Sequence, residues 1–165
     1  MIQITLTVNG RTVAATVEPR TSLADFLREH CRLTGTHLGC EHGVCGACTI
    51  ELNGQIVRAC ITLAVSCDGQ QVRSIEGFDD DPQMEVVRAA FHAEHGLQCG
   101  FCTPGMLISA RDMLRRHPQL SEQRVRVEMS GNLCRCTGYA GIVRACRSAA
   151  ATLSAPADAP AEQGE

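Results

Sequence analysis

The sequence predicts an α+β protein, in which a small mixed sheet with one helix precedes a helical half. Three observations support this fold class. Apolar and polar residues alternate in the N-terminal segments, which is typical of half-buried strands. Apolar residues recur at helical spacing after residue 82, and most of these segments begin at a capping residue or a proline. A cysteine-rich segment in each half separates the regular elements.

The N-terminus predicts a β-hairpin. Apolar residues occupy alternate positions from Ile2 to Val8, and Asn9-Gly10 is a strong signal for a two-residue turn. In the resulting register Ile2 faces Val17 and Val8 faces Arg11. The apolar residues of both strands then share one face, which supports the pairing.

Four further elements complete the predicted N-terminal half. Thr21 or Ser22 caps a short helix that runs to about His30 with three apolar residues inward. A loop rich in glycine and cysteine covers residues 34–47, and a second Asn-Gly turn at residues 53–54 forms another hairpin. The inward residues of the helix are expected to be Leu23, Phe26 and Leu27. The expected strands are Cys48–Leu52, Gln55–Cys60 and Gln71–Ile75.

The second half is predicted to be helical. Residues 77–82 carry three consecutive aspartates and are expected to form a linker, and Pro82 suits the first position of a helix that ends near Gly96. Further helices begin at Thr103-Pro104, after Ser121 and near Tyr139. The last has the apolar stripe Ile142, Cys146, Ala149 and Leu153. The expected domains are residues 1–77 and 82–153, followed by a disordered tail at 154–165 that is rich in alanine, proline and acid.

Composition limits the possible roles of the protein. The chain has 165 residues, a formal net charge of −3 and eleven cysteines. This charge argues against a nucleic-acid binder, and the absence of a long apolar run argues against a membrane span. The N-terminus lacks the pattern of a secretory signal, so we expect a cytoplasmic protein. Disulfides are rare in that compartment, so the cysteines call for metal, redox or packing roles.

Four cysteines form the first cysteine set, which has the spacing of a plant-type [2Fe–2S] ferredoxin site. Three follow the pattern C-x4-C-x2-C, and the predicted hairpin returns the fourth to them, on the strand beside Cys48. The glycines between them permit the tight backbone path that a cluster loop needs. A structural zinc site and buried free thiols are the alternatives. The first cysteine set is Cys40, Cys45, Cys48 and Cys60.

Four more cysteines form the second cysteine set. One pair lies at the start of the helix opened by Thr103-Pro104, where unpaired N–H groups favour thiolates. The other pair lies near the start of the last helix, so the two pairs could form one four-thiolate site. A thioredoxin-like redox pair at Cys99 and Cys102 is the alternative, but that motif would follow a strand. The second cysteine set is Cys99, Cys102, Cys134 and Cys136.

Three cysteines fall outside both sets. We expect Cys31, Cys67 and Cys146 to be packing residues, because free cysteine often behaves as a small buried hydrophobe. His42 lies inside the first loop, but four cysteines already complete that site. The sequence has no dinucleotide fingerprint, phosphate-binding loop or Ser–His–Asp order.

The two cysteine sets occur in three motifs that resemble the molybdenum hydroxylases, the xanthine dehydrogenase and aldehyde oxidase family. Residues 39–49 (GCEHGVCGACT) resemble the first-cluster loop of that family. Residues 98–105 (QCGFCTPG) and 131–139 (GNLCRCTGY) resemble its two second-cluster motifs. The resemblance covers residues 1 to about 153 and singles out the separate small iron–sulfur subunit.

This resemblance implies a fold, cofactors and partners. The N-terminal domain would be a β-grasp ferredoxin-like fold and the C-terminal domain a four-helix bundle, each with one [2Fe–2S] cluster. Gln98 and Cys136 would approach the molybdopterin cofactor of a large subunit, and the first cluster would face FAD in a medium subunit. The chain would then relay electrons from molybdopterin to FAD in a dimer of heterotrimers, without a catalytic residue of its own.

Two functions of other classes remain open at this point. A free-standing two-cluster ferredoxin-type carrier would shuttle electrons between enzymes, although a simple carrier needs only the first half. A zinc-stabilised interaction module would use the same cysteines without redox chemistry. The substrate and the terminal electron acceptor leave no trace in the sequence.

Overall fold

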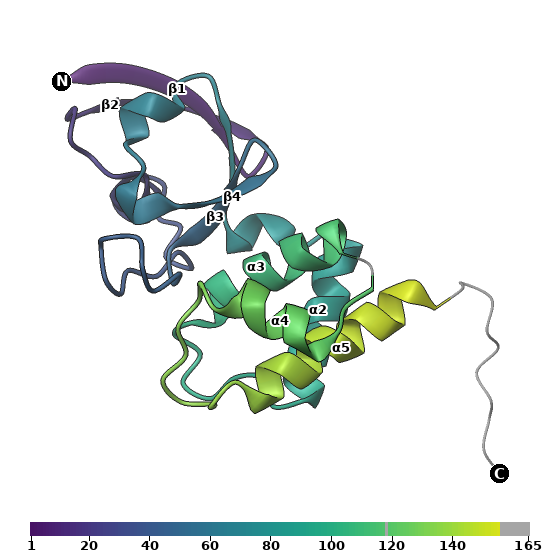
Figure 1. The fold of residues 1–165 in the computed structure, drawn as a ribbon. Coiled ribbons are helices and arrows are strands. Elements are labelled where there is room, and N and C mark those ends of the chain that lie inside the picture. Colours follow the sequence, from purple (N-terminus) through teal and green to yellow (C-terminus); the bar gives the residue numbers. More distant parts are fainter. Residues whose placement is uncertain (118, 156–165) are drawn as a thin grey trace, which may run out of the picture.

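The computed structural model describes residues 1–117 and 119–155. Two hydrophobic cores lie side by side, one beneath the N-terminal sheet and one among the C-terminal helices (Figure 1). The sheet core gathers residues from Ile4 to Val72, and the helical core gathers residues from Phe78 to Ala150. The predicted order of a mixed sheet followed by helices is therefore confirmed.

Within the described residues, five strands form one mixed sheet in the order β2-β1-β5-β3-β4. β1 and β5 run parallel, and the other neighbours are antiparallel. The strands are β1 (Ile2–Val8), β2 (Arg11–Val17), β3 (Thr49–Leu52), β4 (Gln55–Arg58) and β5 (Gln71–Arg73). Between β2 and β3, Ser22 caps the short helix α1 (Leu23–Asp25), which continues as a π-helical turn to His30.

Both predicted hairpin registers are confirmed. Ile2 pairs with Val17 and Val8 with Arg11 in the first, and Leu52 pairs with Gln55 in the second. Both turns have the positive φ angles of a type I′ turn, which asparagine and glycine adopt readily. The turn chemistry therefore fixes which side chains reach the core.

Two strand ends differ from the prediction. β4 ends at Arg58, and Cys60 lies on a 3₁₀ turn (Ala59–Ile61) rather than on the return strand. The Ala59 N–H still donates to the Cys48 carbonyl at 3.2 Å, after which the chain turns away from the sheet. β5 ends at Arg73 instead of Ile75, because the Ser74 N–H donates to the Asn9 side chain and another 3₁₀ turn (Ile75–Phe78) begins.

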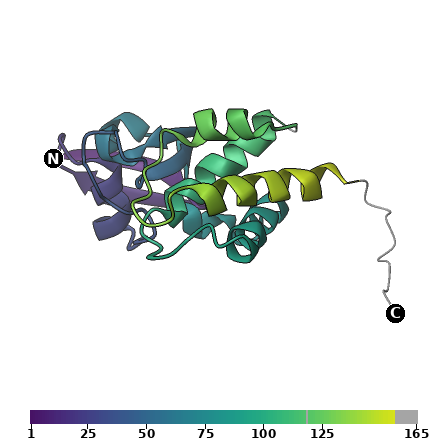
Figure 2. The same cartoon turned by 60° about the horizontal axis from the view of Figure 1, so that its bottom comes forward.

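The helices of the second half begin close to the predicted positions. Asp81 caps α2 (Pro82–Ala93) and Ser121 caps α4 (Glu122–Met129), each by accepting a backbone N–H. α3 (Thr103–Arg116) and α5 (Ala140–Ser154) complete the group, and α5 packs along α2 (Figure 2). Leu153 is 40% exposed, so the predicted apolar stripe of α5 ends at Ala149 and Ala150. Most of the predicted tail, residues 156–165, lies outside the described residues.

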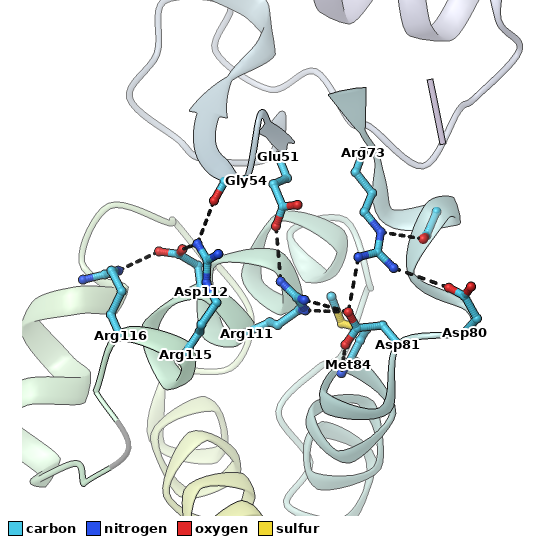
Figure 3. Close-up of polar contacts among 11 residues, drawn as sticks. Glu51, Gly54, Arg73, Asp80, Asp81, Met84, Arg111, Asp112, Arg115 and Arg116 are labelled. Carbon is cyan, nitrogen blue, oxygen red and sulfur yellow. Dashed lines mark hydrogen bonds and ion pairs between the residues drawn. The ribbon is translucent and has the colours of Figure 1, made fainter. Parts of the chain in front are cut away.

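A buried ionic network joins the two halves (Figure 3). Arg111 of α3 contacts Asp81 at 2.6 Å and Glu51 of β3 at 3.2 Å. Arg73 of β5 also reaches Asp81, at 3.3 Å, and both arginines lie over the Phe78 ring. Burial raises the pKa of Asp81, but the hydrogen bonds from Arg111 and the Met84 N–H, together with the charges of Arg111 and Arg73, lower it overall. The segment predicted as a linker is thus pinned to both halves.

α3 runs alongside β3 in the same direction. Gly105 near its N-terminus faces the Gly46 carbonyl before β3, and Arg115 near its C-terminus donates to the Gly54 carbonyl after β3 at 2.7 Å. Because the two elements begin next to predicted ligands, Cys102 and Cys48, their packing sets how the two cysteine sets lie relative to each other.

No helix among residues 1–117 and 119–155 combines the length and apolar character needed to cross a membrane.

Candidate metal centres

The first cysteine loop brings Cys40 and Cys45 into contact. The Cys45 N–H donates to Cys40 Sγ at 3.3 Å, and this bond together with the His42 N–H lowers the pKa of Cys40 to about 6. A Cβ on Gly39 would lie 3.1 Å from Cys45 Sγ, so a larger residue would crowd this sulfur. Gly43 has a φ of +84°, which suits glycine in this tight path.

Cys48 and Cys60 form the second pair of the first cysteine set. Burial, followed by the hydrogen bond with the Cys48 thiol, raises the pKa of Cys60 to about 11. The charge of Cys40 also raises the pKa of Cys60, which indicates that the two pairs lie close together at one site. The predicted first cysteine set therefore converges, with Cys60 delivered by the 3₁₀ turn.

The second cysteine set also converges in two pairs. Cys102, the residue directly before α3, lies within hydrogen-bonding reach of Cys134, and Cys99 lies within hydrogen-bonding reach of Cys136. Burial, followed by the Cys134 thiol, raises the pKa of Cys102 to about 12. Burial also raises the pKa of Cys134, but hydrogen bonds led by the Thr137 hydroxyl lower it overall.

The position of the second pair differs slightly from the prediction. Cys134 and Cys136 lie in the loop before α5, which begins at Ala140 after Tyr139 in a left-handed conformation. Gln98, Cys99 and Cys136 are exposed, so this end of the site faces the surface.

The donor sets fit two binuclear clusters. A [2Fe–2S] cluster takes four thiolates, two on each iron, and each cysteine set offers two close pairs. Among the described residues, no group of three or more His, Cys, Asp or Glu side chains is arranged to hold a single metal ion. A binuclear cluster does not need such a group. The buried Thr103 hydroxyl next to Cys102 has no partner in the described residues, so a donor is free beside the second site.

The loops of the two sites touch directly. The Leu133 N–H donates to the Cys45 carbonyl at 2.8 Å, and the buried Asn132 amide donates to the Gly46 carbonyl at 3.1 Å. A Cβ on Gly46 would lie 2.6 Å from the Gly131 carbonyl, so only glycine fits between the loops. Because Leu133 directly precedes Cys134 in the chain, the Leu133 to Cys45 hydrogen bond connects Cys45 of the first set to Cys134 of the second through main-chain atoms alone.

Several side chains that hold these loops have no sequence signal of their own. Arg58 donates to the Gly131 carbonyl at 2.7 Å, and Ser109 donates to the Asn132 side chain at 2.9 Å. Thr137 donates to Cys134 Sγ at 3.1 Å. These residues come together only through the packing of distant segments, although Asn132 and Thr137 lie inside a cysteine motif.

The cysteines outside both sets lie away from these pairs. Cys67 is buried in the sheet core and Cys146 in the helical core, as predicted for packing residues. Burial raises the pKa of Cys146 to about 12, so its thiol stays protonated at neutral pH. Cys31 is partly buried against the sheet core, and His42 is exposed on the first loop.

Comparison with protein families identifies two iron–sulfur modules. Residues 6–74 match the 2Fe-2S iron-sulfur cluster binding domain, and residues 74–147 match the [2Fe-2S] binding domain. The chain is 49% identical to the caffeine dehydrogenase subunit gamma of Pseudomonas sp. strain CBB1, over 90% of this chain and 91% of that protein. It is also 49% identical to the nicotine 6-hydroxylase small subunit of Paenarthrobacter nicotinovorans, over 87% of each chain.

Solved structures show the same fold. A chain of quinoline 2-oxidoreductase from Pseudomonas putida 86 matches with a TM-score of 0.85 and 46% identity, over 92% of this chain and 94% of that one. The aldehyde oxidoreductase of Desulfovibrio gigas matches with a TM-score of 0.82 and 41% identity, but this chain spans 17% of its length. Together with its two [2Fe–2S]-binding domains, these similarities show that the chain belongs to the small iron–sulfur subunits of the molybdenum hydroxylases, the xanthine dehydrogenase family.

Proposed function

We propose that this subunit relays electrons from a molybdopterin site in a large subunit to FAD in a medium subunit of a molybdenum hydroxylase. The observation that carries this proposal is the direct contact between the two cysteine loops. A chain that housed two independent sites would have no need to join them, whereas a relay requires short separations. The subunit itself contributes no catalytic residue to the oxidation of substrate.

The two cysteine sets are the proposed ligands. Cys40 with Cys45 and Cys48 with Cys60 would each hold one iron of the first cluster. Cys102 with Cys134 and Cys99 with Cys136 would do so in the second, following the close pairs seen in the structure. When bound, each [2Fe–2S] cluster accepts and releases one electron at a time.

The protein supplies position and environment. The Leu133 to Cys45 hydrogen bond and the main chain to Cys134 give a continuous connection between the two ligand loops. Backbone N–H groups around Cys40 stabilise negative charge on sulfur, while burial around Cys102 opposes it. The two surroundings differ, so we expect two clusters with different reduction potentials and spectra.

Exposed apolar residues surround each site and mark the proposed partner faces. Leu97, Phe101 and Leu133 lie near the second site, whose exposed Gln98 and Cys136 would approach the molybdopterin of the large subunit. The FAD subunit would cover the first site, around which the exposed residues are Val44, Ile61 and Leu63.

The remaining features of the proposal concern architecture and setting. Residues 1–77 would form the β-grasp ferredoxin-like domain, and residues 82–153 a domain in which α2, α3, α4 and α5 make a four-helix bundle. The assembly would be a cytoplasmic dimer of heterotrimers. Three of the relatives are named for caffeine, nicotine and quinoline, which are N-heteroaromatic compounds, and others are aldehyde oxidoreductases. The identity to the caffeine and nicotine enzymes is 49%, against 39% for the aldehyde oxidoreductase subunit PaoA, which favours an N-heteroaromatic substrate in the large subunit.

Native purification followed by redox titration tests the proposal. We expect the chain to co-purify with a molybdenum-containing and an FAD-containing subunit, and the reduced complex to give two distinct electron paramagnetic resonance signals. A chain that migrates alone but shows both signals would instead be a free-standing ferredoxin-type carrier. A colourless chain that contains zinc and no iron would overturn both readings.

A further inference from the structure

The loop before α5 holds Cys134 at both its backbone and its sulfur. The Cys134 N–H donates to the Tyr139 hydroxyl at 2.8 Å, and that hydroxyl donates to the Asn132 carbonyl at 3.2 Å. Thr137 donates to Cys134 Sγ at 3.1 Å. Among the eight proposed ligands, as far as the described residues show, Cys134 is the one whose sulfur accepts a hydrogen bond from a side-chain hydroxyl.

The direction of the Thr137 bond follows from the thiolate form of a ligand cysteine. A Cys134 thiolate has no proton to donate, so the Thr137 hydroxyl is the donor. The Tyr139 N–H donates to Thr137 Oγ1 at 3.2 Å, which holds this oxygen beside the sulfur. Tyr139 adopts a φ of +67°, which is uncommon for a residue other than glycine and is found at sites that the surrounding structure holds in place. The turn from Cys134 to Tyr139 therefore presents a preset donor to one ligand sulfur.

We propose that the Thr137 hydroxyl raises the reduction potential of the second cluster by donating a hydrogen bond to the Cys134 thiolate. This inference rests on the proposed ligand role of Cys134. Reduction adds one electron, and its negative charge spreads onto the ligand sulfurs. A donor to sulfur therefore stabilises the reduced form more than the oxidised form. The first site has a backbone donor to Cys40 but no hydroxyl donor within the described residues, so the effect is confined to the second site.

Thr137→Val removes the hydroxyl while keeping the shape of the side chain, and Thr137→Ser keeps the hydroxyl. Thr62→Val is the matched control, because Thr62 lies two residues after Cys60 but donates to the Arg58 carbonyl instead of to sulfur. The holoenzyme of each variant is titrated with dithionite and mediators, and both clusters are followed by electron paramagnetic resonance. Iron content is measured in the same samples.

We expect T137V to lower the midpoint potential of the second cluster alone. A tenfold change in the equilibrium constant for reduction corresponds to about 59 mV for a one-electron couple, and we expect a shift of that order. T137S and T62V should keep the wild-type potentials. The proposal is wrong if T137V retains its iron without a shift, or if T137S shifts as T137V does.

A second measurement applies if T137V does not retain the second cluster. Electron–nuclear double resonance of the wild-type enzyme in H2O and D2O should show an exchangeable proton coupled to the reduced second cluster, and T137S should show it too. Absence of that proton in the wild-type enzyme overturns the inference. Absence of the second cluster itself from the wild-type enzyme would instead contradict the proposed function, so the two failures are distinguishable.

Discussion

Replacing Gly105 with alanine tests the close approach of α3 to the first cysteine loop. The backbone carbonyl of Gly46 faces Gly105, and an alanine Cβ would lie 3.2 Å from the Ala47 carbonyl oxygen and closer still to that of Gly46. Because ordinary C···O contacts lie at about 3.3–3.6 Å, the helix and the loop would have to separate by about 1 Å to accommodate the Gly46 carbonyl.

Two effects of this substitution have opposite signs. Alanine favours a helix over glycine by about 0.5–1 kcal/mol, which would stabilise the protein if the site had room. Overpacking costs about 1–3 kcal/mol. The obstructing atoms are backbone carbonyls, which cannot rotate away as a side chain can, so the upper part of that range applies. We expect a net destabilisation of about 1–2 kcal/mol.

Anaerobic urea unfolding of the cluster-loaded protein, followed by circular dichroism, measures this effect. Ala89→Gly, at an exposed position of α2, gives the helix-propensity difference in the same protein and should cost about 0.5–1 kcal/mol. Electron paramagnetic resonance of the fully reduced protein should show weaker magnetic interaction between the two clusters in G105A. A G105A protein as stable as the wild type, with unchanged spectra, would refute the close contact.

Three other changes test the ion pairs and the cysteine assignments. Arg111→Met should destabilise the protein by about 3 kcal/mol, because it leaves two largely buried carboxylates without their main cation. Arg126→Met, on the exposed face of α4, should cost at most about 0.5 kcal/mol. Equal unfolding midpoints for the two variants would contradict this expectation. Cys45→Ser should lose the first-cluster signal and Cys146→Ser should keep the iron of both clusters, and iron loss from C146S would show that the ligand assignment is wrong. The Arg116 hydrogen bond lowers the pKa of Glu128 in the folded protein. The stability difference between wild type and Glu128→Gln should therefore be full above pH 4.5 and vanish as the pH falls through the lowered folded pKa. A stability difference that does not change between about pH 3 and 6 would argue against the ion pair.

Local rules predicted the elements whose geometry is set within a few residues. The Asn9-Gly10 and Asn53-Gly54 turns accept the positive φ angles of tight hairpins, and they fixed both registers correctly. The caps Ser22 and Ser121 and the proline at position 82 likewise placed the starts of three helices. Each of these signals acts between residues that are only a few positions apart in the sequence.

The features that sequence reasoning missed depend on segments far apart. Arg111 meets Asp81 and Glu51 from positions 30 and 60 residues away, so the aspartate run could be read only as a linker. The spacing of the cysteines predicted which thiols belong together, but the pairing of Cys102 with Cys134 depends on how α3 and the loop before α5 pack. The assignment of the eight ligands stays a prediction until iron is measured in the variants.

The hydrogen bonds between the two cysteine loops have a consequence for biosynthesis. The Asn132 side chain satisfies the Gly46 carbonyl from 86 residues further along the chain, and Leu133 does the same for Cys45. On the ribosome the sheet emerges first and can fold first. Its metal-binding loop, however, lacks these two bonds until residue 133 has been translated. We therefore expect the N-terminal cysteine loop to reach its final hydrogen bonding only after the C-terminal half has been synthesised.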